Sequence, residues 1–261
     1  MKTLLDIAIS AALDAGLEIL KIYDKDFAYT NKKDGSPLTI ADKKSNTIII
    51  SKLKKTQLPI ISEENKSISF KIRSKWKDLW LIDPLDGTKE FINGNGEFTV
   101  NIALISNNKP VLGVVYAPSL DILYFGMNGN SSFKLKNASS CIDDIKNFSH
   151  ISQKLPIKKN KKKYVIIGSR SHQSDLTLNF IKKICNNKPV NFIEKGSSLK
   201  LCMIAEGSAN LYPRLSPTME WDTAAGHAIC LSSGFGVKNY KTKLELKYNK
   251  RNLLNPFFLC N

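Results

Sequence analysis

The sequence predicts a layered α/β protein whose N-terminal half is α+β and whose C-terminal half is α/β. Two patterns carry this prediction. Between residues 98 and 125, short apolar runs alternate with turns rich in Asn, Gly or Pro, which indicates an antiparallel meander. From residue 164 onward, strand-like and helix-like segments alternate, which is typical of α/β layers. The polar, lysine-rich residues 134–163 separate the two patterns, so we expect two domains, at residues 1–133 and 134–261.

Two helices are expected at the N-terminus. Apolar residues recur at helical spacing over residues 3–23, and acidic residues interrupt them, which indicates an amphipathic helix and not a signal peptide. A second helix is expected after Thr39, with Asp42 near its start, where the helix dipole stabilises a carboxylate. A short strand over residues 58–62 then ends at the acidic pair Glu63–Glu64, which by default is a solvated turn.

Two carboxylates flank a proline in the next segment. Pro84 has no N–H for a ladder, so a buried strand should stop at Asp83. Asp83 and Asp86 then face outward on a tight turn closed by Gly87, and Thr88 starts a helix. Such closely spaced carboxylates suit Mg²⁺, and the N–H groups of a helix start suit phosphate. The alternative is a solvated Asp-Pro turn followed by an Asp-Gly turn.

The C-terminal half continues the alternation of strands and helices. Ser169 and His172 follow its first strand, Arg214 ends its third strand, and Asp222 lies at the start of its last helix, where it would act as a cap. The expected strands are 164–168, 190–193 and 209–214, and the expected helices are 175–185, 196–206 and 220–231.

The composition excludes several classes of protein. The formal charge of +16 comes from 39 Lys and Arg against 23 Asp and Glu, but the lysines are scattered and few arginines occur, which favours a solvated lysine surface over a nucleic-acid interface. The five cysteines are an odd number without C-x-x-C spacing, which argues against a disulfide framework and a zinc site. We therefore expect a cytoplasmic protein with no transmembrane segment; a peripheral contact with the cytoplasmic face of the inner membrane stays open.

Three motifs, in this order along the chain, resemble the signatures of the lithium-sensitive, Mg²⁺-dependent inositol monophosphatase superfamily. They are Ser62-Glu-Glu64, Asp83-Pro-Leu-Asp-Gly-Thr88 and Trp221-Asp-Thr-Ala-Ala-Gly226. Further segments resemble the CysQ branch of that superfamily, whose members are 3′(2′),5′-bisphosphate nucleotidases. These segments are 87–92, 96–105, 113–118 and Gly196-Ser-Ser-Leu-Lys200.

The resemblance implies a layered αβαβα sandwich of the sugar-phosphatase type, with the metals in the first domain and substrate contacts in the second. It implies two or more Mg²⁺ ions. Glu64, Asp83 and the Leu85 carbonyl would hold one ion, and Asp83, Asp86 and Asp222 would hold another. Asp42 and Thr88 would orient and deprotonate the attacking water, with Glu64 as a third catalytic residue.

The same resemblance implies that the enzyme converts adenosine 3′,5′-bisphosphate (PAP) to AMP and phosphate, a reaction of sulfur assimilation. The residues implied to face this substrate are Glu64, Leu85, Asp86, Gly87, Thr88, Ser169, His172, Ser197, Ser198, Lys200, Arg214 and Asp222. For several of them a purely structural role stays open: His172 could be a helix cap, Lys200 a solvated helix residue and Arg214 a surface ion-pair partner.

Two alternatives to the nucleotidase remain. An inositol or other sugar monophosphate phosphatase would share the metal site but would not need a pocket for a second phosphate. A basic nucleic-acid-binding protein would bind in a salt-dependent way without metal, but five carboxylates around one cleft would repel a phosphate backbone. The expected partner is therefore a small nucleotide bisphosphate and not a nucleic acid, and both a monomer and a homodimer are compatible with the sequence.

Overall fold

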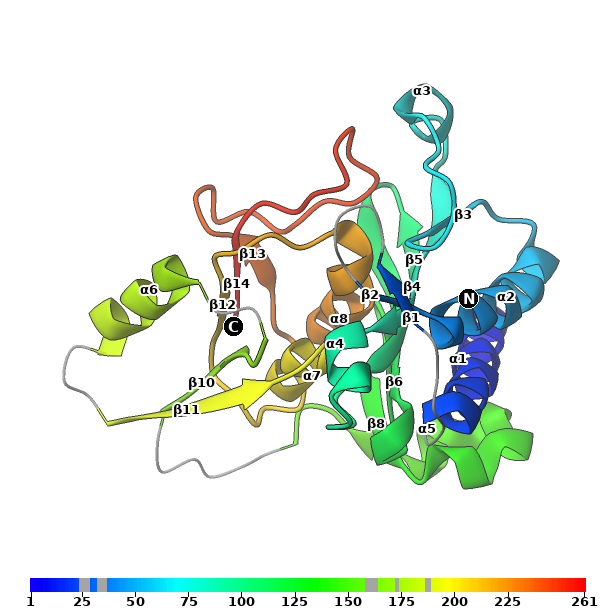
Figure 1. Ribbon diagram of the computed structural model, residues 1–261, viewed down its shortest axis with the longest axis horizontal. Helices are drawn as coiled ribbons and strands as arrows, with labels where there is room; N and C mark the ends of the chain where they lie inside the picture. The colour runs from blue at the N-terminus through cyan, green and yellow to red at the C-terminus, as the bar shows by residue number, and fades with distance from the viewer. Residues whose placement is uncertain (24–28, 32–36, 158–163, 172–173, 186–188) are drawn as a thin grey trace.

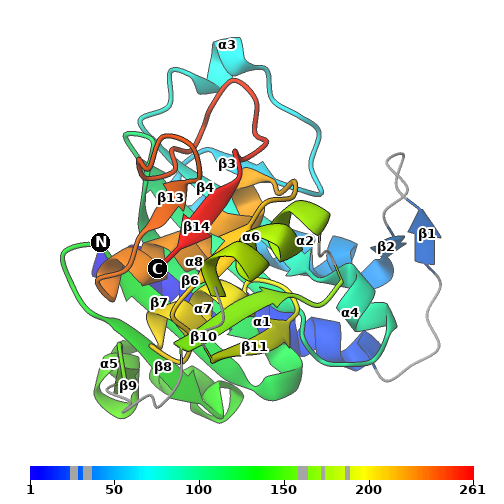
Figure 2. The same ribbon diagram turned by 90° about the vertical axis from the view of Figure 1, so that its left-hand side faces the viewer.

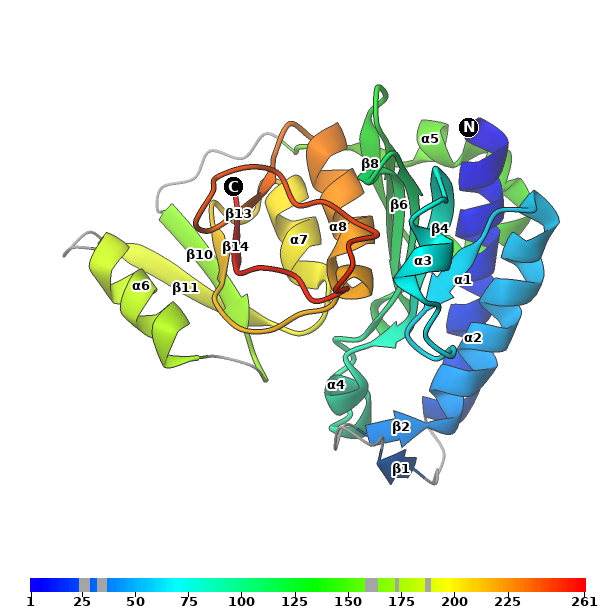
Figure 3. The same cartoon turned by 90° about the horizontal axis from the view of Figure 1, so that it is seen from above.

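The fold is a sandwich of alternating helical and sheet layers. The computed structural model describes residues 1–261 except 24–28, 32–36, 158–163, 172–173 and 186–188. Seen from above, a helix pair, a large sheet, a second helix pair, an outer group of strands and an outer helix follow one another across the molecule (Figure 3). This order confirms the predicted αβαβα arrangement.

The first layer is the pair of helices α1 (Lys2–Tyr23) and α2 (Ile40–Leu53). Both were expected from their apolar spacing. Their buried side chains, such as Ile9, Leu13 and Ile49, join Trp80 and Ile102 of the large sheet in one hydrophobic core. Between the helices, β1 (Tyr29–Asn31) and β2 (Pro37–Thr39) pair antiparallel.

The large sheet, several of whose strands are labelled in Figure 1, has its strands in the order β3-β4-β5-β6-β7-β8-β9. Strands β3 and β4 pair in parallel, and every later neighbour pairs antiparallel, as the predicted meander requires. The strands are β3 Ile60–Ser62, β4 Asp78–Asp86, β5 Thr99–Ser106, β6 Lys109–Ala117, β7 Ile122–Met127, β8 Ser132–Lys136 and β9 Gln153–Lys154.

Helices α7 (Leu199–Ala205) and α8 (Glu220–Ser232) cover the other face of this sheet. Helix α8 lies very close to β6, because a Cβ atom built on Gly113 would be 2.1 Å from the carbonyl oxygen of Ala225. The absence of a side chain at Gly113 is therefore what allows the helix backbone to approach the sheet.

The outer strands form two small sheets that adjoin each other (Figure 2). Strands β10 (Tyr164–Ser169) and β11 (Val190–Lys195) are parallel. Strand β14 (Phe258–Cys260) pairs antiparallel with both β12 (Tyr212–Arg214) and β13 (Val237–Asn239). A bridge between Ile166 and Leu211 joins the two sheets, and α6 (Asp175–Cys185) lies outside them.

Shorter helices connect these elements. They are α3 Phe70–Arg73, α4 Thr88–Ile92 and α5 Phe148–Ile151, with 3₁₀ helices η1 Lys54–Thr56, η2 Pro118–Leu120 and η3 Ala138–Asn147. Over the residues that the structure describes, no helix combines the length and the apolar character needed to cross a membrane.

One expectation about these strands is wrong. Strand β4 does not stop at Asp83 but continues to Asp86, because an irregularity in its pairing with β5 accommodates Pro84. The expected domain boundary after residue 133 falls inside β8, whose hydrogen bonds to β7 and β9 hold this segment in the large sheet. The division into two domains stays a prediction, but residues 134–154 belong with the N-terminal sheet.

Candidate active site

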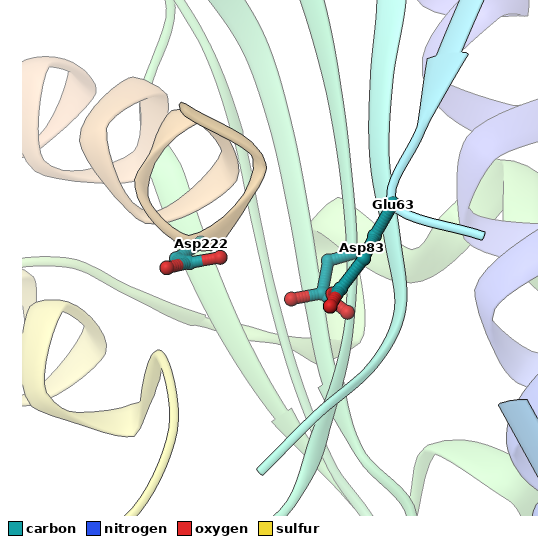
Figure 4. Close-up of side chains that lie close together, drawn as sticks. All are labelled: Glu63, Asp83 and Asp222. Atoms are coloured by element: carbon teal, nitrogen blue, oxygen red, sulfur yellow. The ribbon is translucent and has the colours of Figure 1, made fainter. Parts of the chain in front are cut away.

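Three carboxylates from distant parts of the chain meet at one edge of the large sheet. Oxygen atoms of Glu63, Asp83 and Asp222 lie within 4.8 Å of one another. Glu63 follows β3, Asp83 lies in β4, and Asp222 lies in the first turn of α8, so that the helix side chain faces the two sheet side chains (Figure 4). We call these three residues the acidic cluster.

The register of β3 and β4 decides which glutamate joins the acidic cluster. Ser62 is paired with Ile82, and the Glu63 backbone N–H donates to the Ile82 carbonyl at 3.3 Å, which extends the parallel pairing by one residue. Glu63 is therefore the neighbour of Asp83. The family resemblance implies Glu64 as the ligand, but Glu63 is the glutamate that belongs to the acidic cluster and lines the cavity, and Glu64 is not among the described residues that line it.

A bulge in β4 brings Asp86 to the same side as Asp83. Asp83 is opposite Asn101 and Asp86 is opposite Thr99, so two residues of β4 face one residue of β5. Side chains three positions apart in a regular strand point to opposite faces, and the extra residue of a bulge cancels this alternation. Pro84, which cannot donate to a ladder, lies within the bulge.

Several hydrogen bonds hold the carboxylates in place. Asp83 Oδ1 accepts from the Leu85 backbone N–H at 3.2 Å, and Asp222 Oδ2 accepts from the Met219 backbone N–H at 2.8 Å. The Ser45 hydroxyl donates to the Pro84 carbonyl at 2.7 Å and ties the bulge to α2. The positions of these acids are therefore fixed by the backbone that carries them.

The electrostatics of the acidic cluster call for a cation. Burial, followed by the charges of Glu63, Asp86, Asp222 and Asp42, raises the pKa of Asp83 well above its ordinary value. The pKa of Asp222 is likewise raised, first by burial and then by Asp86 and Glu63. Carboxylate oxygens are the ligands of hard divalent cations, and such a cation would remove the repulsion among them. The donor set therefore fits a metal of this class.

The acidic cluster opens into a cavity of about 250 Å³. Most of the predicted site residues line it: Asp83, Leu85, Asp86, Gly87, Thr88, Ser169, Ser197, Ser198, Lys200, Arg214 and Asp222. Asp42 is buried in α2, close enough for its charge to act on Asp83, but it is not among the described residues that line the cavity. His172 lies outside the described residues. The cavity thus joins residues from both halves of the chain.

The turn after the bulge forms one wall of this cavity. Gly87 adopts φ +89°, a left-handed conformation that glycine reaches without strain, and α4 begins at the next residue. The Thr88 hydroxyl donates to the Leu85 carbonyl oxygen at 3.4 Å. Leu85, Gly87 and Thr88 therefore line the cavity beside Asp83 and Asp86.

The opposite wall is the segment that leads into α7. The Ser197 hydroxyl donates to Asp86 Oδ2 at 2.7 Å, and the Ser198 hydroxyl donates to the Asp222 carbonyl at 2.7 Å. Lys200 is only 5% exposed, and its ammonium group donates to the carbonyl oxygens of Lys195 (3.3 Å) and Ser197. Burial lowers the pKa of Lys200 to about 8, although the charge of Asp86 opposes this shift.

The chain is similar to known proteins over its whole length. The family model described as "Inositol monophosphatase family" matches residues 1–256. The chain belongs to the inositol monophosphatase family. A solved structure of another family member, CysQ from Bacteroides thetaiotaomicron, superposes with a TM-score of 0.93 at 42% identity, covering 100% of this chain and 97% of that one. The Thermotoga maritima IMPase TM1415 shares the fold, with a TM-score of 0.77 at 22% identity.

Curated members of the inositol monophosphatase family are similar over nearly their whole length. The 3′(2′),5′-bisphosphate nucleotidase CysQ of Salmonella typhimurium is 41% identical over 252 residues, which cover 95% of each chain. The protein of the same name from Escherichia coli K12 is 38% identical and covers 98% of each chain. This family is metal-dependent, in agreement with the acidic cluster.

Some polar residues in and beside the cavity were not predicted from the sequence. Thr99 and Asn101 are buried in β5, where the Asn101 amide donates to Ser198 Oγ at 3.0 Å and to Asp86 Oδ2 at 3.4 Å. Glu90 and Tyr212 also line the cavity. Thr99 and Asn101 could have been predicted, because polar residues at alternate positions of a buried strand lie on the same face of the sheet.

Proposed function

We propose that this protein is a Mg²⁺-dependent 3′(2′),5′-bisphosphate nucleotidase that hydrolyses PAP to AMP and phosphate. One observation supports this function most directly. A cluster of carboxylates and a buried lysine face the same cavity, so that a site for cations and a site for an anionic group lie side by side. A substrate with two phosphates would use both of these sites. The curated relatives are named as 3′(2′),5′-bisphosphate nucleotidases, which act on substrates of this kind.

Four carboxylates and one carbonyl are the proposed metal ligands. Glu63, Asp83 and the Leu85 carbonyl would hold one ion, and Asp83, Asp86 and Asp222 would hold a second, with Asp83 shared. Bound Mg²⁺ ions would lower the pKa of the attacking water and neutralise charge on the phosphoryl group and the leaving oxygen. The acidic cluster, which repels itself without a cation, supports this role.

The turn after the bulge would receive the phosphate that is cleaved. In our proposal the backbone N–H groups of Gly87 and Thr88 donate to its oxygens and orient the phosphorus atom for in-line attack. Asp42 would accept the proton of the attacking water through the Thr88 hydroxyl, as a general base does. Correct positioning and charge neutralisation supply most of the rate in phosphoryl transfer, so little covalent chemistry is required of these residues.

The opposite wall would hold the second phosphate and the nucleoside. Lys200 is the proposed charge partner of that phosphate, because it lines the cavity and its ammonium group keeps a positive charge below pH about 8. Ser169, Ser197, Ser198, Arg214 and His172 are the further proposed substrate contacts. A monophosphate ester would leave Lys200 without a phosphate to bind.

The experiment that tests this function compares two substrates. Phosphate release is measured from PAP and from inositol 1-phosphate, first with Mg²⁺ and then with EDTA. We expect metal-dependent turnover with a clear preference for PAP, measured as kcat/KM. Preference for the inositol ester would retain the metal site and contradict the bisphosphate assignment, whereas turnover of neither would contradict both.

A further inference from the structure

Glu97 links the two halves of the chain without lining the cavity. It lies between α4 and β5 in the N-terminal half and is only 6% exposed. Its carboxylate contacts Arg170, Lys195 and Gly196, all of which belong to the C-terminal half. Glu97 is not among the described residues that line the cavity, so any effect on the reaction passes through its partners.

The two oxygens of Glu97 each accept two hydrogen bonds. Oε1 accepts from Lys195 Nζ at 2.8 Å and from Arg170 Nη2 at 3.1 Å. Oε2 accepts from the Gly196 backbone N–H at 2.8 Å and from Arg170 Nε at 3.0 Å. Arg170 directly follows β10 and Lys195 ends β11, so one carboxylate holds the ends of both parallel strands.

The residues that follow this contact form the cavity wall. Gly196 is packed tightly against the chain at Glu97, because a Cβ atom there would be 2.7 Å from the Glu97 carbonyl oxygen. Ser197 has φ +51°, a left-handed conformation that is costly for a residue other than glycine and needs support from its surroundings. In that conformation its hydroxyl reaches Asp86 at 2.7 Å.

We infer that Glu97 is a positioning residue for substrate specificity: by holding Lys195 and Gly196 it fixes Ser197 and Ser198 against the acidic cluster. This inference rests on the proposed function, since the wall that Glu97 holds is the one assigned to the second phosphate and the nucleoside. The other wall, from Asp83 to Thr88, is built within the N-terminal half. Loss of Glu97 should therefore weaken binding of PAP more than it disturbs the reacting phosphate.

The substitution Glu97→Gln tests this role with almost no change in volume. One of its two terminal atoms becomes an NH₂ group that cannot accept a hydrogen bond, so two of the four contacts are lost whichever way the amide turns. Glu18→Gln is the matched control, because Glu18 pairs with two lysines, Lys21 and Lys44, away from the cavity. If Glu97→Gln does not fold, Arg170→Gln removes two of the same hydrogen bonds from a side chain that is 43% exposed.

Two measurements are made on these variants. Steady-state kinetics with PAP should show that KM rises about tenfold in Glu97→Gln while kcat stays within about threefold, the size expected for lost charged hydrogen bonds. A merely structural role would lower kcat through a smaller active fraction and leave KM unchanged. Amide hydrogen exchange should become about tenfold faster at Gly196 and Ser197 in Glu97→Gln and stay unchanged in Glu18→Gln.

The outcomes separate this inference from the proposed function. If the wild type hydrolyses PAP and Glu97→Gln has the wild-type KM and exchange rates, the positioning role is wrong and the function stands. If the wild type does not hydrolyse PAP, the function fails and the specificity role fails with it. In that case the exchange rates alone decide whether Glu97 holds the segment from Lys195 to Ser198.

Discussion

Asp83 and Asp86 point into the same cavity although they are three residues apart in one strand. The bulge opposite Val100 of β5 makes this arrangement, because it removes one step of the alternation that would otherwise send Asp86 to the other face. Asp83 can therefore belong to the acidic cluster while Asp86 faces Ser197 across the cavity.

The neighbouring glutamates provide a matched pair of variants. Glu63→Gln should lower kcat/KM for PAP by roughly 10²-fold or more, because a neutral amide is a poor ligand for a divalent cation. Glu64→Gln should change it by less than about threefold, since Glu64 is not among the cavity-lining residues described. Both values are measured at saturating Mg²⁺. A larger loss in Glu64→Gln than in Glu63→Gln would return the ligand role to Glu64.

Asp83→Asn should stabilise the metal-free protein and abolish most of its activity. Burial and the neighbouring carboxylates make the charge of Asp83 unfavourable in the folded state without metal, which raises its pKa, and an amide keeps the acceptor for the Leu85 N–H. We expect the variant to melt about 2–4 °C above the wild type in EDTA, which corresponds to about 1 kcal/mol in a chain of this size.

Differential scanning calorimetry in EDTA and in excess Mg²⁺ checks this expectation. The order of the two melting temperatures should reverse with Mg²⁺, because only the wild type gains stability from a bound cation. A variant that melts below the wild type in both conditions would show that Asp83 stabilises the fold through contacts other than metal binding.

The pH dependence of PAP hydrolysis should reflect Lys200. Because the pKa of Lys200 is lowered to about 8, the ammonium group loses its charge as the pH rises through this value, and KM for PAP should then increase. Lys200→Met should have a KM about tenfold higher at pH 7. It should also lack the rise in KM above pH 8. An unchanged pH profile in the variant would remove Lys200 from the substrate site.

A rise in pH should weaken PAP binding at Lys200, but through the same side chain it should increase the stability of the folded protein. Its folded pKa lies below its ordinary value of 10.5, so the unfolded chain holds the proton more tightly between pH 8 and 10.5. The penalty for burying the charge is therefore present below pH 8 and disappears as the pH rises through that window. Urea unfolding measures the unfolding free energies of the wild type and of Lys200→Met. The difference between the two values should close or reverse from pH 8 to pH 10.

Acid should weaken the contacts of Glu97. Burial acts to raise the pKa of Glu97, but the hydrogen bonds from Arg170, Lys195 and the Gly196 N–H outweigh it and lower the pKa to about 2. A carboxylate with a lowered pKa contributes stability that is complete above its ordinary pKa of 4.5 and is lost as the pH falls to about 2.

The difference in unfolding free energy between the wild type and Glu97→Gln isolates this contribution. It should be constant above pH 5 and should shrink between pH 4.5 and 2, because both proteins then carry a neutral group at position 97. Urea unfolding at a series of pH values measures it. A difference that stays constant down to pH 2 would mean that the charge of Glu97 does not contribute.

The elements near the site were largely predictable because each has a local signal. Helices α1, α2 and α6 follow from apolar spacing or flanking turns, and the meander follows from alternating runs and turns. The carboxylates Asp83, Asp86 and Asp222 follow from motifs that each lie within a few residues. Local patterns of this kind survive folding because the same residues that form them also pack against the core.

What the sequence could not provide was the pairing between distant segments. Choosing Glu63 over Glu64 requires the register of β3 against β4, and a shift of one residue reverses the choice. The continuation of β4 past Pro84 requires the partner strand that accommodates the bulge. The contact of Glu97 with Arg170 joins residues 73 positions apart, for which no local pattern exists.

Under the proposed function, the close approach of α8 to the sheet at Gly113 would make cation affinity sensitive to a position that contacts none of the proposed ligands. Any side chain at Gly113 must push the backbone at Ala225 away from β6, and Asp222 belongs to the same rigid helix. The helix would carry this carboxylate away from its partners on the sheet. The substitution Gly113→Ala, which adds one methyl group in the core, should therefore lower the affinity for a divalent cation although it changes no residue that lines the cavity.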